Sequence, residues 1–157
     1  MTTVQESDPI TSSTKEREVD RLLHHYAESH RNPINEKIHF LCVPTIMWTV
    51  LGLIWAIHPW AAFGGALLAL VYYFSLSFNF AIGMALMASI MLAILQSIPP
   101  AYVLPSAGIV FVVAWIFQFI GHKIEGKKPS FFEDVRYLLI GPLFVLSFLY
   151  RRLHIRY

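Results

Sequence analysis

Charged residues are missing from the middle of this 157-residue chain: no Lys, Arg, Asp or Glu occurs over the 85 residues from Ile38 to His122. A soluble helix is apolar along one stripe only and carries polar residues on its other face, so it cannot remain uncharged over such a length. Several apolar spans of roughly 20 residues can, because that length crosses the hydrocarbon layer of a bilayer. The sequence therefore predicts an integral membrane protein.

Cysteine and a strong charge imbalance are also missing. The single cysteine, Cys42, excludes an internal disulfide and argues against a metal site built from thiolates. The net charge is only +2, and no basic helix or alternation of basic and aromatic residues is present, so we expect no nucleic acid partner. All charged residues lie instead in residues 1–37 and 123–157.

Turn signals divide the charge-free region into four predicted spans, at about residues 39–57, 60–78, 80–98 and 102–121. The separators are His58-Pro59, the polar residues Ser77 and Asn79, and Pro99-Pro100. Each predicted span is long enough to cross a bilayer. We therefore expect four transmembrane helices.

Two shorter helices are expected at the ends of the apolar region. Apolar residues in 16–30 recur at spacings of three and four, which predicts an N-terminal amphipathic helix. Residues 137–150 are short for a crossing and contain Gly141-Pro142, which favours a short interfacial or re-entrant helix. The expected fold class is thus all-α: a multi-pass membrane bundle in a single domain over residues 16–157, preceded by a disordered tail at residues 1–15.

Basic residues flank the apolar region on both sides. Because short loops rich in Lys and Arg stay in the cytoplasm, an even number of crossings places both ends of the chain there. His39 opens the first predicted span and His122 closes the fourth, so both lie at the cytoplasmic face, together with His30. His58 lies at the opposite face. Three histidines distant in sequence are therefore expected to converge.

A site that combines histidine and carboxylate ligands and leaves some coordination positions of the metal open suits Fe(II), and also Zn(II). Glu125 follows His122 by three residues, which places both on one face of a helix if the helix continues that far. We therefore expect a metal site at His30, His39, His122 and Glu125. Asn32 and Asn35 are candidates to hold the second nitrogen of a ligating histidine.

Other functions fit the same residues. A zinc-dependent membrane lipid hydrolase would use the three histidines as ligands and Glu125 as its general base. A third hypothesis is a small non-enzymatic membrane protein, such as a transporter or scaffold. A transporter normally carries polar or charged groups at mid-membrane, and the predicted spans contain few.

Two segments of the chain resemble a known family. YAESHRNPINEKIHFLCVPTI (residues 26–46) and WIFQFIGHKIEGKKPSFFED (residues 115–134) are similar to the two signature blocks of the membrane-bound 2-hydroxy fatty acid dioxygenases. The first block has the spacing Tyr-x3-His-x-Asn-Pro-x-Asn-x3-His, and the second has Phe-Gln-x2-Gly-His followed by Glu and Pro.

The resemblance implies a function. Members of the family are Fe(II)-dependent enzymes of fatty acid α-oxidation that use O2 to shorten a long-chain 2-hydroxy fatty acid by one carbon during the breakdown of sphingoid bases. The histidines of the family correspond to His30, His39 and His122. The expected membrane is the endoplasmic reticulum in a eukaryote and the inner membrane in a bacterium.

Overall fold

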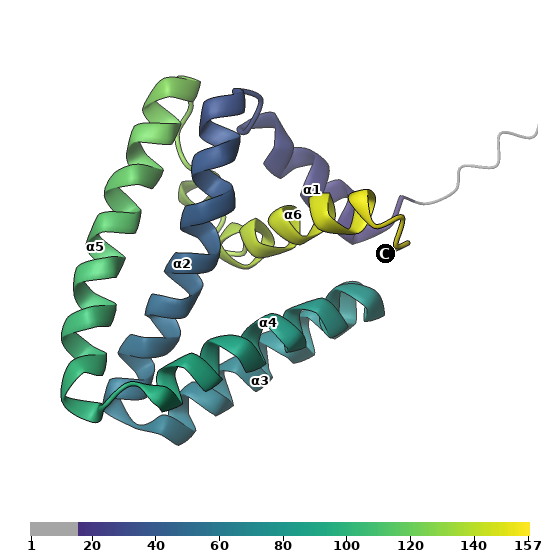
Figure 1. The fold of residues 1–157 in the computed structure, drawn as a ribbon. Helices are drawn as coiled ribbons and strands as arrows, with labels where there is room; N and C mark the ends of the chain where they lie inside the picture. Colours follow the sequence, from purple (N-terminus) through teal and green to yellow (C-terminus); the bar gives the residue numbers. More distant parts are fainter. Residues whose placement is uncertain (1–15) are drawn as a thin grey trace, which may run out of the picture.

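The computed structural model describes residues 16–157, and the described chain is helical throughout, without strands (Figure 1). The predicted tail at residues 1–15 lies outside the described residues. The elements, in chain order, are α1 (Glu18–Glu28), α2 (Pro33–Ile57), α3 (Pro59–Leu76), α4 (Phe78–Ser97), α5 (Pro100–Glu125), the short 3-10 helix η1 (Ser130–Phe132) and α6 (Tyr137–Arg152). The predicted all-α class is confirmed.

Four of these helices, α2 to α5, are long and apolar enough to cross a membrane. Two of them extend beyond the spans expected from the sequence. Helix α2 begins at Pro33 because the Asn32 side chain accepts a hydrogen bond from the Ile34 N–H at 2.9 Å, and proline suits the first position of a helix. Helix α5 continues to Glu125 and ends at Gly126, whose φ of 73° is a left-handed conformation that glycine adopts readily. His39 and His122 therefore lie within helices.

Helices α2 and α5 form an antiparallel pair (Figure 1). Glycine allows them to approach closely at both ends of their contact. A Cβ at Gly52 would lie only 2.9 Å from the Ala107 Cβ, and a Cβ at Gly121 would overlap the Asn35 side chain. The start of α2 is thereby held against the end of α5.

Helices α1 and α6 pack together at the side of this pair, and α3 packs against α4 (Figure 1). The apolar face that the sequence predicted for α1 is buried against α6, through Val19, Leu22, Leu23 and Tyr26, in a hydrophobic cluster that also includes residues of α3 and α4. The short C-terminal helix is also confirmed, since α6 is not among the helices of membrane-spanning length. Its position in a membrane interface stays a prediction.

The outward faces of the four long helices carry large apolar side chains. Leu41 and Leu68 are each 73% exposed, and Ile57 is 83% exposed. In water this surface would be an aggregation hazard, whereas hydrocarbon solvates it without cost. The exposed surface is therefore compatible with a membrane protein.

Candidate metal centre

Three histidines from separate segments meet at one end of the α2–α5 pair. His30 lies between α1 and α2, His39 lies in the second turn of α2, and His122 lies in the last turn of α5. Because α2 and α5 run in opposite directions, the beginning of one lies beside the end of the other (Figure 1). The structure thus brings together the three histidines that the sequence analysis singled out.

The potential ligand nitrogens of these side chains all lie within 4.8 Å of one another. His39 Nε2 and His122 Nε2 are 3.1 Å apart. The His30 ring lies edge-on to both of the others, with ring centroids 4.2 Å from His39 and 5.2 Å from His122. All three side chains are buried. The cluster is therefore compact and shielded from solvent.

Main-chain carbonyl groups set the tautomer of two of the rings. The Nδ1–H of His30 donates to the Tyr26 carbonyl at 2.7 Å, and the Nδ1–H of His39 donates to the Asn35 carbonyl at 2.9 Å. A carbonyl oxygen only accepts hydrogen bonds, so the hydrogen is on Nδ1 and the lone pair is on Nε2. This arrangement is the one that a metal-ligating histidine adopts.

Two polar atoms of the cluster have no hydrogen-bond partner within the described part of the chain. His30 Nε2 and His122 Nδ1 are both buried and unpartnered. An unsatisfied polar atom in an apolar interior is costly, and a metal at His30 Nε2 would give that nitrogen a partner. Three imidazole donors suit Fe(II) or Zn(II) and leave coordination positions open. The residues present therefore fit a divalent transition metal.

The surroundings of His30 keep its ring neutral and oriented. Burial lowers the pKa of His30 below its usual value, with smaller opposing effects from the Tyr26 carbonyl and the Glu125 carboxylate. The Tyr26 ring stacks on the imidazole at a centroid distance of 4.1 Å. Because metals bind the neutral imidazole, both effects favour coordination.

Glu125 lies on the same turn of α5 as His122, but its carboxylate is not among the groups that gather within 4.8 Å. It accepts hydrogen bonds from the N–H groups of Arg31 at 3.0 Å and Asn32 at 2.9 Å, and from Asn35 Nδ2 at 3.1 Å. The carboxylate therefore ties the end of α5 to the segment that leads into α2. That Glu125 is also a metal ligand stays a prediction.

The two asparagines occupy different places around the histidines. Asn32 caps α2 with its side chain and contacts Glu125 through its N–H. Asn35 is fully buried, orients His39 through its main-chain carbonyl, and donates from Nδ2 to the Ser29 carbonyl at 3.2 Å. Asn35 thus contacts a histidine directly, whereas Asn32 acts on the segment that carries the histidines.

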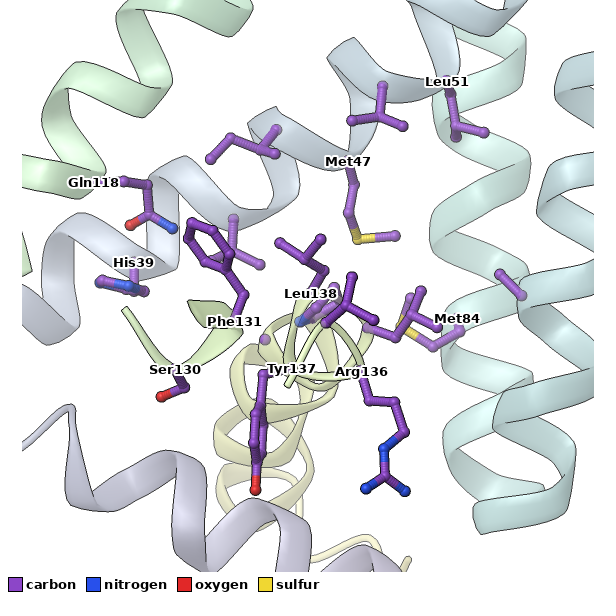
Figure 2. A pocket seen from close by; sticks show the side chains of 18 of the residues that line it. His39, Met47, Leu51, Met84, Gln118, Ser130, Phe131, Arg136, Tyr137 and Leu138 are labelled. Atoms are coloured by element: carbon purple, nitrogen blue, oxygen red, sulfur yellow. The ribbon is translucent and has the colours of Figure 1, made fainter. Parts of the chain in front are cut away.

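A cavity of about 590 Å³ adjoins the histidine cluster, and His39 and His122 form part of its wall. Figure 2 shows His39, Gln118 and Ser130 on one side of this cavity and Met47, Leu51 and Met84 on the other. Most of the wall is apolar. The centre therefore opens onto a space suited to an apolar ligand.

Gln118 and Ser130 were not among the site residues expected from the sequence. Both are buried, and Gln118 Oε1 and Ser130 Oγ have no partner among the described residues. Gln118 precedes His122 by four residues on α5, so its position on the same helix face follows from helical spacing. Ser130 comes from η1, and no sequence pattern points to it.

The fold and the site together define a class: an all-helical protein with four helices of membrane-spanning length and a buried three-histidine group suited to a metal. Comparison with protein families narrows this class. The model of the Mpo1-like family, described as 2-hydroxy-palmitic acid dioxygenase Mpo1-like, matches residues 17–153. The chain belongs to this family, as the two resembling blocks predicted. No curated protein and no solved structure matches the chain.

Proposed function

We propose that this protein is an Fe(II)-dependent dioxygenase that uses O2 to shorten a long-chain 2-hydroxy fatty acid by one carbon. The family name supports the reaction class. The observation that carries the proposal is the convergence of three buried histidines at an apolar cavity. A long-chain 2-hydroxy acid matches both features, because its hydroxyl and carboxylate oxygens suit a metal and its chain suits the cavity wall.

In this proposal the residues of the chain bind, orient and shield the reactants. His30, His39 and His122 would hold the metal, and the Tyr26 and Asn35 carbonyls keep two of the rings in the ligating tautomer. When bound, Fe(II) supplies open coordination positions and redox chemistry with O2. The apolar wall excludes water, so that the acid is held with its reacting carbons near the histidines.

The overall reaction balances without a further reductant. The bond between the first and second carbons breaks, the second carbon becomes the carboxyl group of the shortened acid, and the first leaves as CO2. O2 takes up the electrons, and water is the remaining product. We place this reaction in fatty acid α-oxidation during the breakdown of sphingoid bases.

A zinc-dependent lipid hydrolase is the competing enzyme for the same histidines. It would need a general base that is free to take a proton from water. Glu125, three residues after His122, is the general base that the sequence suggested, and three N–H donors already engage its carboxylate. This engagement favours the dioxygenase.

We further propose that the histidine end of the bundle faces the cytoplasm, with the acid reaching it from the bilayer. The support is the distribution of Lys and Arg at both ends of the apolar region. Single cysteines introduced at Glu16 and His154, in a chain with Cys42 replaced by alanine, should both react with a reagent confined to the cytoplasmic side. Labelling of the two cysteines from opposite sides of the membrane contradicts this orientation.

The reaction is tested with purified protein loaded with Fe(II) under anaerobic conditions. Admission of O2 should convert 2-hydroxyhexadecanoic acid to pentadecanoic acid, with one O2 consumed per acid shortened. Hexadecanoic acid should react poorly, because it lacks the second oxygen donor. Equal turnover of the two acids, or product formation without O2, contradicts the proposal.

Variants test the residues that carry the proposal. Alanine at His30, His39 or His122 should abolish metal retention and turnover. His58 provides a control, because it lies at the other end of α2, about 28 Å from His39 along the helix axis. Its side chain accepts a hydrogen bond from the Trp60 N–H at 3.3 Å, so His58→Asn retains the helix cap. Loss of metal in a folded His58→Asn protein would show that the three-histidine site is wrong.

A further inference from the structure

The wall of the cavity follows continuous faces of two helices, each of which includes a histidine of the cluster. On α2 the lining residues recur at intervals of one, three and four positions, as expected for one helix face: His39, Val43, Ile46, Met47, Val50, Leu51 and Ile54. On α5 they are Phe111, Trp115, Gln118 and His122. The cavity therefore extends along both helices, away from the histidine cluster.

The length of this space matches a long acyl chain. From His39 to Ile54 the cavity follows α2 for about 22 Å, at the rise of an α-helix. The hydrocarbon layer of a bilayer is about 30 Å thick and contains two leaflets, so the chains of one leaflet cover about 15 Å. The cavity is thus long enough for a fatty acid of membrane length.

The polarity of the wall differs between its two ends. Two polar residues, Gln118 and Ser130, line the cavity on the side of His39 (Figure 2). Ile54 and Gly65, at the far end, offer no polar side-chain atoms. These observations match an amphiphile whose polar head lies at the histidines and whose chain lies along α2.

Arg136 also lines the cavity, on the side of α6, and offers a competing position for an anionic head. Its guanidinium already contacts the Asp134 carboxylate, with Nη2 2.7 Å and Nε 2.8 Å from Oδ2. The Arg136 side chain is also 53% exposed, in contrast to the buried Gln118 and Ser130. The head is therefore better accommodated beside the histidines.

From these features we infer that the cavity is a binding site for one long-chain fatty acid, and that the wall at Gly65 sets the longest chain accepted. The head lies at Gln118 and Ser130, and the end of the chain lies between Ile54 and Gly65. The inference rests on the proposed function for the nature of the reacting head group. Binding of the chain itself requires neither metal nor turnover.

Gly65 and its neighbour Gly64 form a matched pair for a test. A Cβ at Gly65 would meet only the Ile54 side chain, at 3.9 Å, so a larger residue there projects into the cavity without a backbone clash. A Cβ at Gly64 would meet nothing within 4 Å, and Gly64 is exposed and does not line the cavity. Both glycines lie in α3, so leucine changes helix propensity equally at the two positions.

The experiment measures binding of dodecanoic, hexadecanoic and eicosanoic acids to metal-free protein in lipid nanodiscs, by displacement of a fluorescent fatty acid. Each methylene that leaves an apolar site weakens binding roughly fourfold. Gly65→Leu should therefore weaken the binding of eicosanoic acid by about tenfold or more while leaving that of dodecanoic acid within about twofold. Gly64→Leu should bind all three acids as the unaltered protein does.

Two further variants keep the test decisive. Ala69→Leu narrows the cavity from a half-buried position on α3 and replaces Gly65→Leu if that variant fails to fold. Gln118→Leu removes the polar contact with the head, so it should weaken the binding of all three acids by a similar factor.

The outcomes separate this inference from the proposed reaction. If Gly65→Leu lowers the longest chain length that binds tightly, the result supports the binding site even if the iron-loaded protein shows no turnover. Turnover of 2-hydroxy acids with identical chain-length profiles in the Gly64→Leu and folded Gly65→Leu proteins overturns the cavity but not the reaction. Failure of fatty acids to displace the probe also overturns the inference, because it indicates that bilayer lipid fills the space.

Discussion

Replacing Glu125 with glutamine tests whether this residue supports the metal centre or binds the metal. The carboxylate accepts hydrogen bonds from Arg31, Asn32 and Asn35, all in the segment between His30 and His39. Glutamine keeps the shape of the side chain but removes its charge. It also turns an NH2 group toward at least one N–H donor, so part of this hydrogen bonding is lost.

The size of the effect follows from the number of bonds and their exposure. A hydrogen bond to a charged group contributes about 1.5–3 kcal/mol, and the half-buried position of Glu125 favours the lower end of this range. We expect Glu125→Gln to lower the free energy of unfolding by about 2 kcal/mol, and Glu125→Ala by about 3–4 kcal/mol. Loss of support around a ligating histidine also lowers metal affinity by about 10–100-fold.

Thermal unfolding and the visible spectrum of Co(II)-loaded protein are the two measurements. Glu125→Gln should unfold at a lower temperature but, at saturating Co(II), keep the spectrum of the unaltered protein, because the ligand atoms are unchanged. Glu133→Gln is a control, since Glu133 is exposed and its contact with His25, at 3.2 Å, is a surface one. Unaltered stability together with a changed Co(II) spectrum would contradict a supporting role for Glu125 and identify it as a metal ligand.

Three other predictions concern packing, protons and metal. Gly121→Ala should destabilise the protein by about 1–3 kcal/mol, because the added Cβ overlaps the Asn35 side chain. Gly108→Ala should be neutral or slightly stabilising, because its Cβ would meet nothing within 4 Å. Chemical unfolding measures both free energies. Metal-free protein should be most stable above about pH 6.5 and lose stability as the pH falls toward the lowered pKa of folded His30, because unfolded His30 takes up a proton that the folded ring does not. Melting temperatures should show this loss, and His30→Gln should reduce it. A chelator should lower the melting temperature of metal-loaded protein by an amount that His122→Ala abolishes.

Much of this protein could be predicted from local sequence alone. The 85 uncharged residues predict helices of membrane-spanning length, because a polypeptide surrounded by hydrocarbon must satisfy its backbone hydrogen bonds internally. The apolar face of α1 follows from residue spacing, because that face must be buried. The convergence of the three histidines was also predictable. A hydropathy profile with four crossings places His39 and His122 at the same end of the bundle, and His30 lies just before the first crossing. The two blocks that resemble the family lie within its match over residues 17–153.

Packing between distant segments decided the rest. Helix α2 begins at Pro33 rather than at His39, and α5 continues to Glu125, where its carboxylate meets N–H groups more than 90 positions earlier in the chain. Sequence spacing shows that Glu125 and His122 share a helix face, but not which partners that face meets. Ser130 and Gln118 reach the cavity from separate elements, and the cavity exists only once α2 to α6 are in place. Hydropathy constrains each helix separately, whereas a cavity and a hydrogen-bond network depend on the relative positions of several helices, which only the tertiary structure fixes.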